Sequence, residues 1–115
     1  MITITPENGK SLFDVHGLSF REDSGCVIAK DGDKLLGYCL YDLDEKRLVV
    51  RYLQSDELTL ADGVLRAVLN MAVQRGITDA QYDDSAPVSL LEQLHFISDL
   101  SKKTLDLDKF FKGCP

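Results

Sequence analysis

A stripe of apolar side chains at helical spacing constrains the fold more than any other feature of this chain. Its members recur at intervals of one, three and four residues, as on the buried face of an amphipathic helix: Leu65, Val68, Leu69 and Ala72. Strand-like segments flank this helix, residues 47–54 before it and 77–82 after it. Two strands joined by a long helix run parallel in one sheet, with a right-handed crossover. The pattern therefore predicts a β-α-β unit in an α/β fold.

The ends of the helix are also marked in the sequence. Thr59 can cap the free amides of the first turn, and Asp62 stands three residues later, as in a capping box. Gly76, directly after Arg75, is a favourable stop because glycine adopts a left-handed backbone without strain. We expect the helix to begin near Thr59 and to end before Gly76.

Two turn signals before the helix separate three strand-like segments. Asp31-Gly32-Asp33 joins residues 26–30 to residues 34–42, and Asp-Gly is a strong hairpin signal because tight turns need a positive φ. Asp44-Glu45-Lys46 then leads into residues 47–54. The three strands are predicted to form an antiparallel meander that precedes the crossover.

Side-chain alternation predicts which faces of these strands are buried. The second strand is apolar on both faces, which suggests a central strand covered by helices. We expect one of its faces to carry Leu36, Tyr38 and Leu40, and the other to carry Leu35, Cys39 and Tyr41. We expect the apolar face of the third strand to carry Leu48, Val50 and Tyr52.

A second helix and a last strand are expected near the C-terminus. The helix should start at Ser85 or Ser89, with Pro87 tolerated in its first turn. Residues 104–108 alternate leucine with aspartate, which predicts a strand. Together the elements predict a mixed sheet, a meander followed by a crossover, with helices packed on it.

Length and composition indicate one domain over residues 1–115. The chain has 115 residues, 44% of them hydrophobic and 28% charged, which is ordinary for a globular domain. Its N-terminal region, residues 1–25, is short, and Phe13, Val15 and Leu18 support only a brief helix there. No apolar run approaches the ~20 residues that span a bilayer, and the start lacks a basic signal segment. We therefore expect a cytoplasmic protein.

Charge and cysteine content exclude several classes of partner and site. The formal net charge of −6 repels phosphate backbones, so nucleic acid is not an expected partner, and Arg47 and Arg51 make only a small basic spot. The three cysteines lack the spacing of a disulfide framework or a zinc site, and no metal is predicted. Cys26 and Cys39 lie in apolar runs and are expected to be buried. Hydrolase triads, Walker loops and dinucleotide fingerprints are not supported.

Two segments resemble a known family. Residues 63–77 read Gly-Val-Leu-Arg-Ala-Val-Leu-Asn-Met-Ala-Val-Gln-Arg-Gly-Ile, and Leu90-Leu91-Glu92-Gln93-Leu94-His95-Phe96 follows a short strand. In this order and separation the pair resembles the GNAT superfamily of acyl-CoA-dependent N-acetyltransferases. The resemblance covers roughly residues 26–111 and implies a GNAT-like fold, in which a helix N-terminus holds the pyrophosphate of coenzyme A. Compared with the family, the region 1–25 is shortened.

The resemblance also implies which residues bind the acyl-CoA. Aligning Gly63 with the first glycine of the family's pyrophosphate motif puts Arg66 at a position that is often basic. It puts Leu60 where the family has Arg or Gln, and Leu65 where it has a small residue, so we expect Leu65 to hinder an anion. The family's pantetheine contacts the end of the preceding strand. The implied residues for acetyl-CoA, or another acyl-CoA, are Leu53, Ser55, Gly63, Val64, Leu65 and Arg66.

Two residues are candidates for catalysis. Glu57 precedes the helix and could deprotonate an amine, or simply interact with the helix dipole. Tyr82, followed by two aspartates, could supply an acid and a base, or belong to an ordinary turn. Many relatives use a tyrosine of the second helix as proton donor, and Leu91 stands at that position here. His95 replaces the glycine of the family pattern, and a cap at the helix end is the simpler interpretation.

Two functions therefore remain open. The first is transfer of an acyl group from an acyl-CoA to the primary amine of a small molecule or peptide. The second is a non-catalytic GNAT-fold module that has lost the cofactor site and acts as a binding or regulatory partner. Leu60, Leu65 and Leu91 favour the second, while the order of helices and strands favours the fold without deciding between them. Neither function involves nucleic acid or a membrane, and a homodimer is left open.

Overall fold

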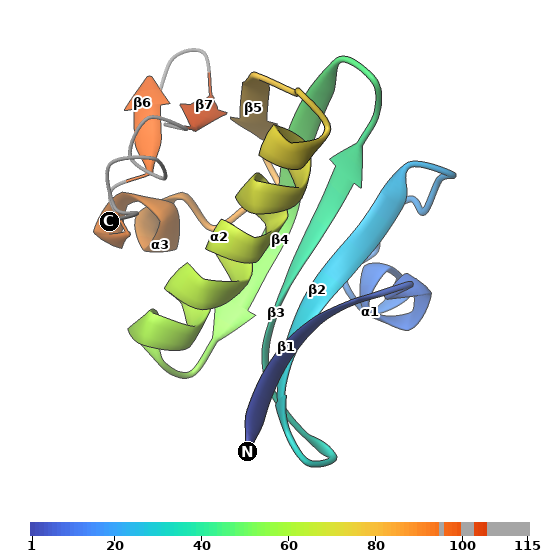
Figure 1. Cartoon of the computed structure of the whole chain (residues 1–115), viewed down its shortest axis with the longest axis vertical. Coiled ribbons are helices and arrows are strands. Elements are labelled where there is room, and N and C mark those ends of the chain that lie inside the picture. Colours follow the sequence, from blue (N-terminus) through green and yellow to red (C-terminus); the bar gives the residue numbers. More distant parts are fainter. Residues whose placement is uncertain (95, 100–102, 106–115) are drawn as a thin grey trace.

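A mixed β-sheet forms the centre of the protein (Figure 1). The computed structural model describes residues 1–94, 96–99 and 103–105. Across these residues the sheet has seven strands in the order β1-β2-β3-β4-β5-β7-β6. The strands are β1 (Ile2–Glu7), β2 (Ser24–Asp31), β3 (Lys34–Leu43), β4 (Arg47–Ser55), β5 (Asp79–Tyr82), β6 (Ile97–Asp99) and β7 (Thr104–Leu105).

The helices lie on both faces of this sheet. They are α1 (Lys10–Val15), α2 (Leu58–Gln74) and α3 (Val88–Gln93). Side chains of α2 and α3 pack with one face, whereas α1 packs with the other (Figure 1). We call these the α2 face and the α1 face.

The predicted meander and crossover are both confirmed. β2, β3 and β4 pair antiparallel in sequence order, and β4 pairs parallel with β5 after the chain passes through α2. Gly32, with φ 61°, takes the first position of the two-residue turn between β2 and β3. Glycine therefore supplies the positive φ that the sequence predicted for this turn.

The helix α2 starts near Thr59 and ends before Gly76, as predicted, but its N-cap differs from the prediction. After Gln74, Gly76 has φ 77°, and the amide of Ile77 donates to the Ala72 carbonyl at 2.9 Å, as in a Schellman motif. At the other end Glu57 occupies the N-cap, and no side chain caps the helix. The expectation that Thr59 caps α2 is therefore wrong.

A bulge in β3 corrects the face that was predicted for Leu36. Ala29 lies opposite Gly37 and Lys30 lies opposite Leu35, so Leu36 is an extra residue in the ladder. Leu36 consequently packs on the α2 face, not beside Tyr38 and Leu40, which lie on the α1 face. Leu35 is exposed instead of covered.

A second bulge, in β4, corrects the face that was predicted for Tyr52. Leu40 of β3 lies opposite Tyr52, and Tyr41 lies opposite Val50, so Arg51 is the extra residue. Val50 faces α2 as expected, but Tyr52 packs on the α1 face. A bulge inverts the alternation of every residue beyond it.

The ends of the chain show the remaining differences. α3 begins at Val88 with Pro87 at its N-cap, so neither predicted serine starts it. β7 confirms the start of the predicted last strand, while residues 106–108 lie outside the described residues. β1 and β6 were not predicted. The brief helix near Phe13 is confirmed as α1, although Val15 is 75% exposed and contributes little to packing.

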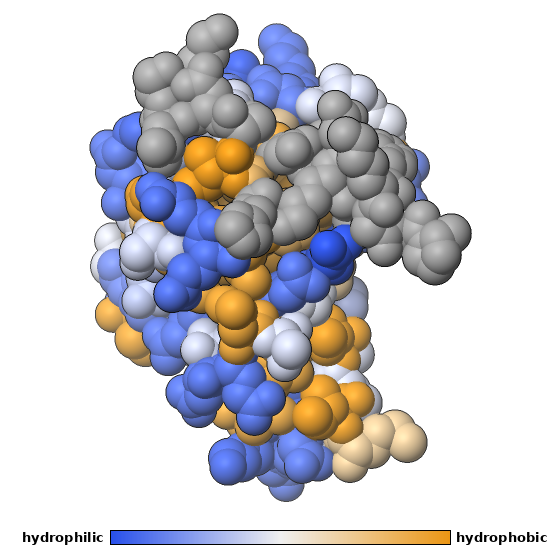
Figure 2. All heavy atoms as spheres, turned by 90° about the vertical axis from the view of Figure 1, so that its left-hand side faces the viewer, coloured by the Kyte–Doolittle hydropathy of each residue, from blue (hydrophilic) through white to orange (hydrophobic). Residues whose placement is uncertain are grey.

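Most of the hydrophobic core lies on the α2 face. The predicted stripe of α2 is fully buried there, against strands β2 to β5 and α3. A smaller cluster on the α1 face consists of Phe13, Cys26, Ile28, Tyr38 and Leu40, with Leu12, Leu18, Phe20 and Tyr52 partly buried around it. Seen from the left-hand side of Figure 1, hydrophobic atoms reach the surface in patches between hydrophilic ones (Figure 2).

Candidate functional site

The strand β4 extends beyond the end of β5. β4 stays paired with β3 as far as Ser55, which lies opposite Gly37. Its parallel pairing with β5 ends at Val50, whose carbonyl oxygen accepts from the amide of Asp83 at 3.1 Å. Among the described residues, no strand pairs with residues 51–55 on that side. The backbone groups that this open stretch turns away from β3 are therefore not used in the sheet.

The helix α2 starts beside the open stretch. The amide of Glu57 donates to Ser55 Oγ at 3.2 Å, and the first helical bond runs from the amide of Ala61 to the Glu57 carbonyl at 3.0 Å. The amides of residues 58–60 precede that bond and have no acceptor within the helix. Such amides, at the positive end of a helix dipole, form a favourable site for an anion.

Acidic side chains oppose this attraction. Asp56 and Glu57 are exposed directly before α2. Asp62 accepts a hydrogen bond from Arg66 Nε at 2.7 Å, so the positive charge expected to favour an anion is already paired. The Arg66 guanidinium also lies over the ring of Phe96, 5.3 Å from its centroid. The start of α2 therefore offers free amides but no unpaired cation from Arg66.

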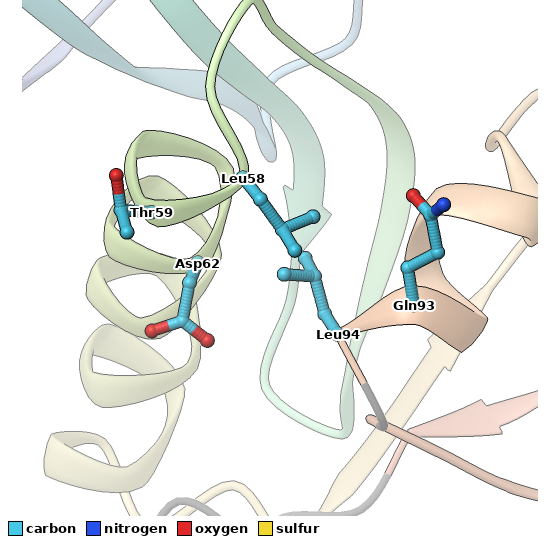
Figure 3. Close-up of a pocket in the computed structure, with 5 residues that line it drawn as sticks. All are labelled: Leu58, Thr59, Asp62, Gln93 and Leu94. Carbon is cyan, nitrogen blue, oxygen red and sulfur yellow. The ribbon is translucent and has the colours of Figure 1, made fainter.

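A pocket of about 290 Å³ lies between the start of α2 and the end of α3. Its walls are Leu58, Thr59, Asp62, Gln93 and Leu94. In Figure 3 the side chains of Leu58 and Leu94 lie toward each other, with Asp62 on one side and Gln93 on the other. The pocket is thus apolar in its middle and polar at its rim, beside the helix amides.

Three of the predicted acyl-CoA residues lie inside α2 in addition to Arg66. Gly63 is in the second turn, and a Cβ added there would come within 3.0 Å of Ile4 Cδ1 on β1. Val64 and Leu65 are fully buried in the core. The expectation that Leu65 hinders an anion is therefore wrong, because its side chain packs against the sheet. A role for these three residues in ligand binding stays a prediction.

The other predicted residues lie at the ends of β4 and β5. Leu53 is buried, whereas Ser55 is half-buried and its hydroxyl donates to the Leu36 carbonyl at 3.4 Å. Glu57 is exposed beside the α2 start, but the side chain of Tyr82 is only 3% exposed and packs in the core. The structure thus brings Leu53, Ser55 and Glu57 to the open stretch. The catalytic roles of Glu57 and Tyr82 stay predictions.

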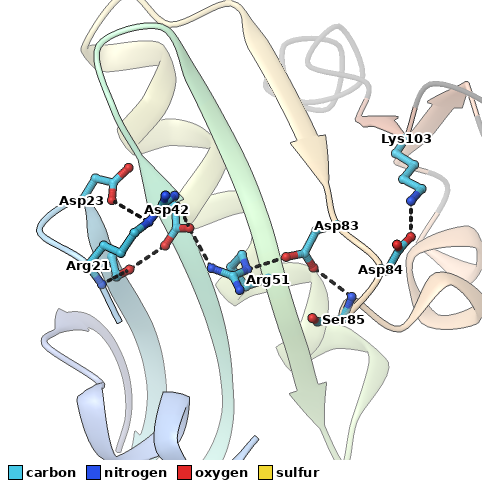
Figure 4. A network of polar contacts seen from close by, with 9 residues as sticks. Arg21, Asp23, Asp42, Arg51, Asp83, Asp84, Ser85 and Lys103 are labelled. Carbon is cyan, nitrogen blue, oxygen red and sulfur yellow. Dashed lines mark hydrogen bonds and ion pairs between the residues drawn. The ribbon is translucent and has the colours of Figure 1, made fainter. Parts of the chain in front are cut away.

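A network of charged side chains crosses the sheet on the α1 face (Figure 4). Asp42 of β3, which is buried, accepts from Arg51 Nη1 at 2.8 Å, from Arg21 Nη2 at 3.2 Å and from Ser24 Oγ at 2.6 Å. Arg51, the bulge residue of β4, also pairs with Asp83 after β5. The network therefore ties β3, β4 and the segment after β5 together where β5 ends.

The basic spot expected from the sequence is neutralised. Arg51 is engaged in this network, and Arg47 lies 3.6 Å from the carboxylate of Asp79. Ion pairs of this kind leave little free positive charge on that face of the strand.

The sequence did not reveal a cluster of hydrogen-bonded aromatic side chains on the α1 face. His16, the C-cap of α1, places Nε2 2.6 Å from the hydroxyl oxygen of Tyr38. The Tyr38 hydroxyl donates to Gln54 Oε1 at 3.2 Å, and the His16 ring stacks on Tyr52 at 3.9 Å between centroids. Burial raises the pKa of Tyr38, and nearby Tyr52 raises it further. These residues lie far apart in the sequence, and no local motif links them.

Membrane and metal chemistry find no support within residues 1–94, 96–99 and 103–105. None of the helices there is long and apolar enough to cross a bilayer. The same residues contain no group of three His, Cys, Asp or Glu side chains that could hold a metal ion.

Known acetyltransferase structures share this architecture. A ribosomal-protein-alanine N-acetyltransferase from Brucella melitensis biovar Abortus 2308 superposes with a TM-score of 0.65 at 13% identity, over 86% of this chain and 94% of its own. This chain has a GNAT-like fold. A GNAT family acetyltransferase from Elizabethkingia anophelis, with acetyl-CoA bound, gives 0.53 at 14% identity, over 70% of this chain and 63% of its own. No family model and no curated protein matches the sequence.

Proposed function

We propose that this protein binds an acyl-CoA, with acetyl-CoA as the simplest case, and transfers the acyl group to a primary amine. The observation that carries the proposal is the stretch of β4 that runs beyond the end of β5 and leads to the free amides of α2. The fold adds support, since it is shared with solved acetyltransferases, one of which has acetyl-CoA bound.

The residues present fit an acyl-CoA in outline. The amides of residues 58–60 would hold the pyrophosphate, and backbone groups of residues 51–55 would accept the extended pantetheine arm, as a strand edge accepts a peptide. Both sites would use main-chain groups. They therefore do not need the Arg or Gln that the family has in place of Leu60, or the small residue that it has in place of Leu65.

The transfer itself needs a free amine and a polarised thioester. The amine nitrogen bonds to the acyl carbon as the carbon–sulfur bond breaks. An acceptor ammonium loses two protons in all, one of which ends on the thiol of coenzyme A. Main-chain amides at the open stretch can stabilise the negative charge that develops on the acyl oxygen.

The acidic surroundings predict weak binding. One carboxylate about 6 Å from one phosphate charge costs roughly 1–3 kcal/mol at dielectrics between water and ~20. We therefore expect a small but measurable rise in melting temperature with acetyl-CoA. At ~100-fold excess over Kd a ligand adds about 2.7 kcal/mol, or several degrees for a domain of this size.

A charge variant tests where the donor binds. Asp62→Asn removes a carboxylate from the pocket and releases Arg66, so acetyl-CoA binding should tighten by about threefold to tenfold. Glu45→Gln, with the same change in charge before the other end of β4, should leave binding unchanged. Equal effects of the two variants would show that only net charge matters and would remove the pocket from the proposal.

The acceptor is tested by release of free thiol from acetyl-CoA with a panel of primary amines. The panel should include a short peptide that begins with alanine, because one structural neighbour is a ribosomal-protein-alanine N-acetyltransferase. We expect thiol release that depends on the amine. If millimolar acetyl-CoA neither shifts the melting temperature nor yields thiol, the proposal is wrong.

A further inference from the structure

The aromatic cluster on the α1 face contains one group that can take up a proton. His16, Tyr38, Tyr52 and Gln54 form a continuous set through one short hydrogen bond of 2.6 Å, a second of 3.2 Å and a ring stack at 3.9 Å. Packing alone does not require such bonds, since Phe13 already anchors α1 as a fully buried side chain. The cluster therefore joins α1 to β3 and β4 by polar contacts in addition to packing.

Hydrogen bonding sets the tautomer of the imidazole. Tyr38 has one hydroxyl proton, and it donates this proton to Gln54 Oε1, which can only accept. With the Gln54 amide oriented in this way, the 2.6 Å contact is a donation from His16 Nε2–H to the Tyr38 oxygen. A neutral imidazole that is protonated at Nε2 carries its lone pair on Nδ1. The raised pKa of Tyr38 keeps the phenol protonated around neutral pH, so the arrangement is stable there.

The cluster is attached to the open stretch of β4. Tyr52 and Gln54 both belong to residues 51–55, and Tyr38 lies opposite Gln54 on β3. Leu53, between them, points to the α2 face, where the start of α2 also lies. A strand presents alternate side chains to opposite faces. An acyl donor held at the α2 start and an amine that approaches over Tyr52 would therefore reach the open edge of β4 from opposite faces of the sheet.

We propose that His16 Nδ1 accepts the proton that an acceptor ammonium must lose before it attacks the thioester, with Tyr38 and Gln54 as positioning residues that hold the tautomer. The inference rests on the proposed acyl transfer. In this step an N–H bond of the ammonium breaks, its electron pair stays on the nitrogen as the nucleophile, and the imidazole becomes imidazolium. The imidazolium then releases the proton to water.

The tautomer can be measured without any ligand. Long-range ¹H–¹⁵N correlation on the full-length, ¹⁵N-labelled chain distinguishes the two ring nitrogens, and His95→Gln leaves His16 as the single histidine to be observed. We expect the neutral imidazole of His16 to carry its proton on Nε2. In Tyr38→Phe the preference should weaken, because the hydroxyl acceptor is removed. A proton on Nδ1 in the wild type would overturn the proposal, because the accepting lone pair would then point at Tyr38.

Kinetics separate this inference from the proposed function. His16→Gln should lower amine-dependent thiol release by about 100-fold or more, while the Kd for acetyl-CoA stays unchanged. Tyr38→Phe should lower the rate by a smaller factor. Leu18→Ala, which trims packing in the same cluster without touching a polar group, controls for loosening of α1.

Each outcome has one meaning. If the wild type binds acetyl-CoA and turns over, and His16→Gln turns over equally fast, then His16 is not the proton acceptor while the proposed function stands. If the wild type neither binds acetyl-CoA nor releases thiol, the proposed function is wrong and the role of His16 falls with it. If Leu18→Ala loses as much activity as His16→Gln, the loss reflects packing and the inference fails.

Discussion

The two faces of the sheet differ in the chemistry of the side chains that cover them. On the α2 face the strands meet the apolar sides of α2 and α3, and nearly every buried side chain there is a hydrocarbon or a tyrosine ring. On the α1 face the apolar cluster is smaller, and beside it lie the ion pairs around Arg51 and the hydrogen bonds around His16. The α2 face can stabilise the fold but offers little chemistry in its interior. Groups that exchange protons are found on the α1 face.

The largest expected effect is loss of packing on the α2 face. Leu69→Ala removes a fully buried side chain and should cost about 2–5 kcal/mol of the free energy of unfolding. Leu18→Ala, on the partly buried edge of the α1 cluster, should cost no more than about 1.5 kcal/mol because water already reaches the site. Urea unfolding of both variants measures the difference. Equal losses would mean that the two faces contribute alike to stability.

A smaller effect is expected from the ion-pair network. Arg51→Met leaves the buried carboxylate of Asp42 with only Arg21 and Ser24, and should cost roughly 1–3 kcal/mol. Arg47→Met breaks an exposed pair on the same strand and should change stability by less than about 0.5 kcal/mol. The comparison is again made by denaturant unfolding. A cost for Arg51→Met no greater than for Arg47→Met would show that the network is a surface feature.

The smallest expected effect concerns the cysteines, one on each face. Burial raises the pKa of Cys26 from 9.0 to about 11, with a further contribution from Glu7, and it raises the pKa of Cys39 as well. The unfolded chain therefore releases these protons at lower pH than the native one, so stability is full below pH 9 and falls as pH rises toward 11. For Cys26 alone the loss between pH 8 and pH 10 should be about 1 kcal/mol.

Variants and labelling check this pH dependence. Cys26→Ala should flatten part of the decline, and Cys39→Ala another part, in unfolding measured at each pH. Without denaturant both thiols should react slowly with a thiol reagent. The sequence also predicts that Cys114, near the chain end, reacts readily, and this residue lies outside the described residues. Fast labelling of Cys26 alone would show that the α1 face admits solvent where the α2 face does not.

Local patterns were enough to predict the order of the elements from β2 to α3, but not the registers of the strands. The hairpin at Gly32, the stripe of α2 and its stop at Gly76 each follow from a few neighbouring residues, and all three are confirmed. The faces of Leu36 and Tyr52 were wrong because a bulge is set by hydrogen bonds between strands, and side-chain alternation does not record it.

The candidate site was only partly accessible from sequence. The region of the α2 start was found, but the free amides belong to residues 58–60, before the aligned glycine. The strand β1 was missed although Ile and Thr alternate there, because all of its residues are exposed and Pro6 is tolerated only at an edge. The contacts of His16 depend on how α1 packs over β3 and β4, which no local pattern contains.

The bulge at Arg51 shifts the alternation of side chains along β4 by one residue. Before the bulge, Leu48 and Val50 lie on the α2 face. After it, Leu53 lies on that face, whereas Tyr52 and Gln54 lie on the α1 face. If Arg51 were paired within the ladder instead of being the extra residue, Tyr52 would lie on the α2 face and Leu53 on the α1 face. One residue without a partner in the ladder thus decides which side of the sheet receives the polar part of the strand.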